Sequence, residues 1–186
     1  GVGSGDTFEI ISGSNSNDIT LRDGSGNADV VRFENLSDGV DSLNNFNFGS
    51  GNDAIEVSNN AGSGTVNAGM DVDSGAVVSN FDVVVLEGAS AIIDTDANSE
   101  LVAINQSAAF DDNGLAASGE ALFIAREDTD GDATADEVSL FHVNETDGAA
   151  ASGNIDEVNK LATLDDLDPT TDLSGVSFNA DNFDFI

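Results

Sequence analysis

The chain lacks cysteine, tryptophan and tyrosine, and it has only one proline and four basic residues among 186. Without cysteine it cannot be stabilised by disulfides. Without tryptophan and tyrosine, a sugar-stacking cleft would have only phenylalanine to work with. The basic residues, Arg22, Arg32, Arg126 and Lys160, are too few for the positive surface that nucleic acids and anionic membranes require. Nucleic-acid binding is therefore excluded.

Motifs for catalysis and for membrane insertion are also missing. No apolar run approaches the roughly 18 residues of a transmembrane helix. The sequence has no nucleophile elbow, zinc-protease motif, P-loop or dinucleotide fingerprint. The one histidine, His142, falls in a predicted strand, where a packing role is more common than a catalytic one. The sequence starts at Gly1 without an initiator methionine or signal peptide, which suggests a fragment or a processed form. These observations predict a protein that is not an enzyme and does not insert into membranes.

What the chain has in abundance is negative charge. It carries 36 acidic residues and a formal net charge of −32 at pH 7. Such a charge repels itself and opposes a compact fold. Divalent cations or high salt are the two plausible means of neutralising it.

Short apolar stretches alternate with turns rich in glycine, asparagine, aspartate and serine, at intervals of about 8–12 residues. The pattern predicts an all-β fold, either a β-sandwich or an irregular β-solenoid with calcium-binding turns. We expect a single domain over 1–186, or two subdomains that meet near 87–100. At most one short helix is expected, over 107–118, and 154–166 is either helix or strand. The other candidate strands are 7–11, 29–33, 54–57, 76–79, 81–86, 91–94, 100–104, 121–126 and 138–143.

Aspartate recurs regularly in the first third of the chain. Asp6, Asp18, Asp29, Asp41 and Asp53 are separated by 12, 11, 12 and 12 residues, and a strand-type residue soon follows each of them. The spacing predicts stacked or paired strands whose loops share cations, with Asp29, Asp41 and Asp53 among the ligands. The alternative is a series of Asp/Asn/Gly turns that needs no metal.

A second acidic cluster occupies 128–137, between two predicted strands, and its candidate ligands are Asp128, Asp130, Asp132, Asp136 and Glu137. Alternating carboxylates converge when a loop curls around a cation, and Ca²⁺ prefers six to eight oxygen ligands. The spacing begins like an EF-hand. It then departs, because glycine is fourth rather than sixth and a serine stands at position twelve. We expect a β-hairpin loop that binds Ca²⁺; the alternative is a solvated acidic loop.

Several segments resemble RTX-type proteins, which are exported by type I secretion. Residues 49–55, Gly-Ser-Gly-Asn-Asp-Ala-Ile, match G-x-G-x-D-x-U, and 24–31 match it with one insertion. Residues 41–46 fit a D-x-I/L-x-x-F step, and 179–185 resemble the uncleaved C-terminal tail of such proteins. The resemblance implies a type I exporter as partner, Ca²⁺-triggered folding outside the cell, and a secreted or cell-surface location. The complete double-glycine nonapeptide is absent, so a regular β-roll is not expected throughout.

Together these features predict a secreted, calcium-binding structural protein. We expect it to assemble with copies of itself into an extracellular surface layer (S-layer), sheath or filament, with 1–8 and 178–186 as the intersubunit strands. One alternative is the C-terminal type I secretion module of a larger adhesin or hydrolase. Another is a monomer from a salty habitat whose charge is an adaptation to salt.

Overall fold

The structure is a computed structural model of the whole chain. It describes residues 7–10, 16–21, 28–33, 40–48, 53–57, 70–73, 76–77, 83–86, 92–96, 110–111, 120–144, 157–171, 173–179 and 182–185. Asp6 and the strand expected over 100–104 lie outside these residues.

The prediction of an all-β fold is confirmed. The strands are β1 (Thr7–Ile10), β2 (Asp18–Thr20), β3 (Val30–Phe33), β4 (Asp41–Asn44), β5 (Ala54–Val57), β6 (Met70–Asp73), β7 (Ala76–Val77), β8 (Val83–Leu86), β9 (Ile92–Asp94), β10 (Phe110–Asp111), β11 (Glu120–Asp128), β12 (Glu137–Asn144), β13 (Glu157–Leu164) and β14 (Phe183–Phe185). The only helical element among the described residues is one 3-10 turn, η1 (Leu173–Gly175). No helix there is long and apolar enough to cross a membrane.

The helix expected over 107–118 is wrong where the structure describes that segment. Phe110–Asp111 form the short strand β10, which pairs in parallel with β7. The pairing supplies backbone hydrogen bonds that an isolated helical turn with a glycine nearby would form less well. The ambiguous segment 154–166 contains the eight-residue strand β13.

The N-terminal third winds as a two-sided solenoid. β1, β3 and β5 lie side by side and parallel, with Thr7 opposite Val30 and Val30 opposite Ala54. The chain therefore returns to the same sheet after 23 residues (30 − 7) and then after 24 (54 − 30). β2 and β4, in the second sheet, repeat this step with Asp18 opposite Ser42, again 24 residues apart (42 − 18). The 12-residue spacing of aspartates is thus one half of a circuit.

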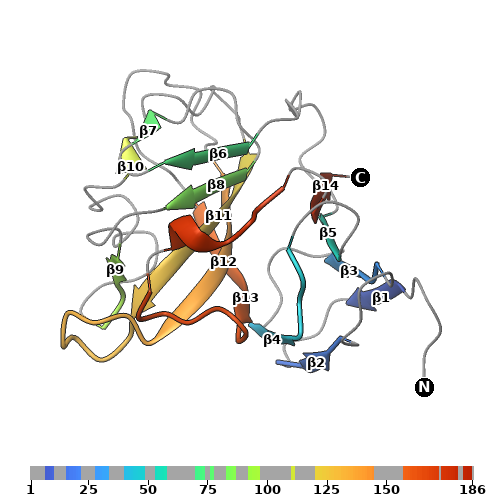
Figure 1. Cartoon of the computed structure of the whole chain (residues 1–186), viewed down its shortest axis with the longest axis horizontal. Coiled ribbons are helices and arrows are strands. Elements are labelled where there is room, and N and C mark those ends of the chain that lie inside the picture. The colour runs from blue at the N-terminus through green and yellow to red at the C-terminus, as the bar shows by residue number, and fades with distance from the viewer. Residues whose placement is uncertain are drawn as a thin grey trace.

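Inward positions of the solenoid are apolar. Val31, Ile55 and Phe183 occupy one register position on β3, β5 and β14, and all three are buried. The next position carries Arg32 and Glu56, which are half-exposed and paired at 2.7 Å between Nε and Oε2. This two-residue alternation is what a strand with one buried face requires. The C-terminal strand β14 completes the sheet beside β5, giving the order β1-β3-β5-β14 (Figure 1).

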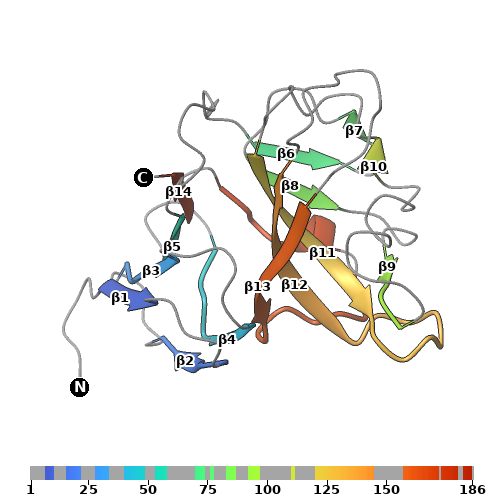
Figure 2. The ribbon, with the colours of Figure 1, turned by 180° about the vertical axis from the view of Figure 1, so that it is seen from behind.

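The second sheet joins the solenoid to an antiparallel hairpin. Its order is β2-β4-β13-β12-β11-β8-β6, and β9 pairs with the far end of β11. β13 is antiparallel to β12 and parallel to β4, so it connects the two parts (Figure 2). A register shift between Leu140 and Phe141 leaves Leu161 as an extra residue on β13, and both Leu161 and Ala162 are buried.

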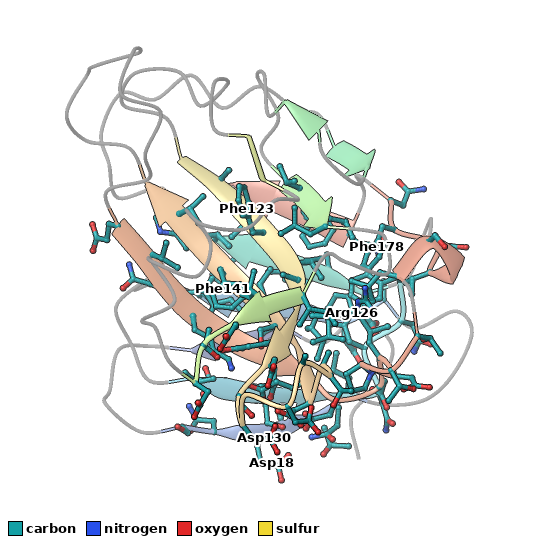
Figure 3. The ribbon with its side chains drawn as sticks, turned by 90° about the vertical axis from the view of Figure 1, so that its left-hand side faces the viewer. Asp18, Phe123, Arg126, Asp130, Phe141 and Phe178 are labelled. Carbon is teal, nitrogen blue, oxygen red and sulfur yellow. The ribbon has the colours of Figure 1, made fainter. Side chains whose placement is uncertain are left out.

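The hairpin strands are buried on both faces. Leu122 and Ile124 of β11 pack in the larger core, with the solenoid residues Val31 and Ile55. Phe123 lies in a second core with Phe141 of β12 (Figure 3). The larger core takes residues from both sides of positions 87–100. The hairpin is thus the centre of the molecule, and a change in its loop acts on strands that support both cores.

Candidate functional site

The loop 129–136 connects β11 to β12 at the end of the molecule away from β1 and β2 (Figures 1 and 2). Figure 3 looks onto this end and shows Asp130 near the tip of the hairpin. Side chains of 129–134 are exposed, whereas Asp128 at the end of β11 is only 3% exposed. The predicted hairpin with an acidic connecting loop is therefore present.

Asp128 fixes the shape of the loop. Its Oδ1 accepts the amide of Gly131 at 2.7 Å, and its Oδ2 accepts the amide of Ala133 at 2.8 Å. The carbonyl of Asp128 in turn accepts the amide of Thr95, which follows β9, at 2.9 Å. A carboxylate oxygen that accepts one hydrogen bond keeps a lone pair for another contact. Asp128 can therefore shape the loop and still face a cation.

Three carboxylates converge at the loop. Asp128, Asp130 and Asp136 each offer an oxygen, and these oxygens all lie within 4.8 Å of one another. Asp136 is held there by Thr129, whose amide and hydroxyl both donate to its Oδ2 at 2.8 Å. These two hydrogen bonds lower the pKa of Asp136 below its ordinary value. Asp136 is therefore a fixed negative charge at neutral pH.

Asp130 is affected by the crowding of charge. The amide of Asp132 favours its ionised form, but the negative charges of Asp132, Asp136 and Asp128 oppose it, and the net effect raises the pKa of Asp130. The loop thus holds carboxylates whose mutual repulsion no lysine or arginine of the loop offsets. A divalent cation would remove this repulsion.

A further acidic residue, missed in the sequence, lies against the loop. Gly131 has φ of +77°, and a Cβ built on it would lie 2.9 Å from Oδ2 of Asp96. β9 brings Asp96 there, because Asp94 pairs in register with Asp128. The signal was available: Asp94-Thr95-Asp96 ends a predicted strand with two acids. Glycine at 131 lets this carboxylate approach.

Not all of the expected ligands meet at the loop. Asp132 lies in the loop but bonds to Thr134 through its Oδ1, at 2.8 Å from the amide. Glu137 lies at the start of β12 and forms an ion pair with Lys160 of β13. Of the five acids predicted over 128–137, the structure gathers Asp128, Asp130 and Asp136.

Asp29, Asp41 and Asp53 lie in the solenoid, far along the chain from the loop, and all are at most 3% exposed. Oδ1 of Asp53 accepts the amide of Asp29, one circuit earlier, at 2.9 Å, and its Oδ2 accepts the amide of Asn47 at 2.9 Å. Oδ1 of Asp41 accepts the amide of Asn17, also one circuit earlier, at 2.7 Å. These contacts tie adjacent circuits together without a cation, and a metal role for the three residues stays a prediction.

We expect Asp53→Ala to lower the free energy of unfolding by about 2 kcal/mol, because the buried amide of Asp29 loses its acceptor. Asn47 is exposed, so water replaces the second contact at little cost. Urea denaturation measures the difference. Asp168→Ala removes an exposed aspartate that bonds to Thr170 and is the matched control. Equal midpoints for the two variants would show that the circuits do not depend on this carboxylate.

No family model, curated protein or solved structure matches this chain. Its own residues are therefore the basis on which a function is proposed.

Proposed function

We propose that the protein is a secreted, calcium-binding structural protein that assembles with copies of itself into an extracellular layer, sheath or filament. The observation that carries the proposal is the convergence of Asp128, Asp130 and Asp136 within 4.8 Å in a chain of net charge −32. Carboxylate oxygens are the ligands that Ca²⁺ prefers, and the loop offers no basic residue to compete with it.

In the proposed site, Asp130 and Asp136 supply exposed carboxylates and Asp128 a buried one. Asp96 lies close enough to Gly131 to contribute directly or through water. Ca²⁺ takes about six to eight oxygens at roughly 2.3–2.6 Å, so water and loop carbonyls would complete the shell. The ion would stabilise the hairpin, and through β11 and β12 the two cores.

Calcium would also couple folding to location. At low Ca²⁺ the acidic chain repels itself and stays available for export, with a type I exporter as the proposed partner. Outside the cell, the free energy of Ca²⁺ binding adds to the free energy of folding. The RTX-type resemblance of 41–46, 49–55 and 179–185 supports this route.

The sheet edges support the assembly part of the proposal. β1 and β2 are each the outermost strand of a sheet, and both stand at the same end of the solenoid. An outer strand has unpaired N–H and C=O groups that can pair with another chain. Like charges on two copies oppose this approach within about 8 Å at physiological salt, and a bound divalent cation offsets it.

The alternative is the C-terminal secretion module of a larger adhesin or hydrolase. The same open end favours it, because a preceding 24-residue circuit would continue both sheets at β1 and β2. In that case the end of the solenoid is covered by the same chain and copies do not associate.

Sedimentation velocity distinguishes the two. We expect ordered polymers above about 1 mM Ca²⁺, in the range of extracellular calcium sites, and dispersal by chelator. Sodium chloride at matched ionic strength is the control for simple screening. A protein that stays monomeric at every Ca²⁺ and protein concentration would contradict assembly and favour the secretion module.

A further inference from the structure

The first and last strands of the chain are the two outer strands of one sheet. In the order β1-β3-β5-β14 every neighbouring pair is parallel, so all four strands run in the same direction. Among the described residues, no strand pairs with the outer side of β1 or of β14. The two open edges face opposite ways, and each presents the hydrogen-bonding groups that the other lacks.

We propose that copies of the protein join head to tail, with β14 of one copy pairing in parallel with β1 of the next. This inference rests on the proposed assembly and specifies its contact. The contact is heterologous, because two different edges meet, and repeating it extends one continuous parallel sheet through successive copies. It therefore produces a polar filament unless the rotation between copies happens to close a ring.

The register across the sheet is compatible with this addition. Phe8, Val31, Ile55 and Phe183 occupy the same register position on the four strands. The three whose exposure is known, Val31, Ile55 and Phe183, are buried. A copy added in register brings Phe183 to the position beside Phe8 of the next copy. The apolar row then continues across the junction.

The neighbouring register position explains why the junction would need a cation. It carries Glu9, Arg32, Glu56 and Asp184 in strand order. Arg32 is paired with Glu56. Across the proposed junction, Asp184 of one copy comes next to Glu9 of the next, so three carboxylates follow one another for each arginine. Like charges directly opposite one another destabilise strand pairing.

The junction is also short. β14 has three residues and β1 has four, so the pairing provides only a few backbone hydrogen bonds. Each contributes little net free energy in water. Association should therefore depend steeply on protein concentration and on neutralising the Glu9–Asp184 position. Ca²⁺ would act here independently of the hairpin loop.

A pair of cysteines tests the junction, because the natural chain has none. Within one copy, Glu9 and Asp184 are three strand spacings apart, roughly 14 Å, which is beyond the reach of a disulfide. Across the junction they would be one spacing apart, about 5 Å. We expect Glu9→Cys with Asp184→Cys, oxidised in Ca²⁺, to give a ladder of covalent oligomers that a reductant dissolves.

The controls separate this contact from assembly in general. Single-cysteine variants should stop at dimers, and Glu9→Cys with Glu157→Cys, which removes the same charge, should give no ladder. Polymers that sediment without a ladder in the Glu9–Asp184 pair would overturn the junction and leave the proposed function standing. A wild-type chain that does not polymerise would overturn both.

Glu9→Arg provides a second test that needs no cysteine. It places a cation next to Asp184 of the neighbouring copy, and an exposed ion pair changes an equilibrium by about three- to fivefold. We expect half-maximal sedimentation at a Ca²⁺ concentration lower by about that factor, with unchanged thermal unfolding of the monomer. An unchanged Ca²⁺ requirement would contradict the proposed register.

Discussion

Replacing Lys160 with methionine is expected to lower the free energy of unfolding by about 3–5 kcal/mol, the usual cost of breaking a buried ion pair. The ammonium of Lys160 lies 2.7 Å from Oε2 of Glu127, and it also pairs with Glu137. The side chain of Glu127 is 3% exposed, so water cannot replace the lost partner. The hydroxyls of Ser139 and Thr95 donate to Glu127, but neither brings a positive charge.

Adding Glu127→Gln to the Lys160→Met variant is the matched control. The amide removes the buried negative charge while it keeps an oxygen for Ser139 or Thr95. We expect the double variant to recover a large part of the lost stability in urea denaturation at pH 7. A single variant as stable as the wild type, or a double variant no more stable than the single, would show that Glu127 does not depend on Lys160.

The same network sets a pH dependence. Burial by itself raises the pKa of Glu127, but the hydrogen bonds of Lys160, Ser139 and Thr95 and the charge of Lys160 lower it below its ordinary value of 4.5. Its contribution to stability is therefore present above pH 4.5 and is lost as the pH falls through the folded-state pKa. Burial lowers the pKa of Lys160, but Glu127 and Glu137 raise it above 10.5. Its contribution is present below pH 10.5 and is lost as the pH rises through the folded-state pKa.

The second large effect concerns calcium. With Ca²⁺ at about 100 times its dissociation constant, one site adds about 2.7 kcal/mol to the free energy of unfolding. For a chain of this length, this corresponds to a rise of roughly 5–10 °C in the midpoint of thermal unfolding. The hairpin strands form the middle of both cores, so the whole fold should respond. We expect chelator to abolish the rise at constant ionic strength.

Two variants localise that effect. Asp130→Ala removes a carboxylate from the converging set and should abolish most of the rise. Asp168→Ala removes an equal charge from an exposed aspartate outside the set and should leave the rise intact. If both variants lose it equally, Ca²⁺ acts by diffuse screening of the net charge and not through a site.

Local patterns in the sequence were sufficient to predict most of the strands, because turn residues and apolar alternation are properties of short segments. The spacing of Asp18, Asp29, Asp41 and Asp53 predicted stacked or paired strands, and the structure pairs them with a period of two such steps. The pairing of β13 with β4 and of β14 with β5 was not predictable. It joins segments more than 100 residues apart, which no local pattern encodes.

The candidate site was only partly visible for a related reason. An aspartate in a turn can satisfy backbone amides or hold a cation, and the sequence is the same in both cases. Asp53 contacts amides of the solenoid, whereas Asp130 faces other carboxylates. Glu137 reads as a ligand beside Asp136 until β13 brings Lys160 to it. Asp96 joins the loop only through the pairing of β9 with β11.

Calorimetric titration of the purified protein with Ca²⁺ at constant ionic strength tests the calcium site most directly. We expect saturable binding with a dissociation constant of about 10⁻⁴–10⁻³ M, as in extracellular calcium modules. Asp130→Ala should weaken it by about tenfold, which is about 1.4 kcal/mol for one lost carboxylate. Heats that show only dilution, or the same binding curve in wild type and Asp130→Ala, would contradict a calcium site in the β11–β12 loop.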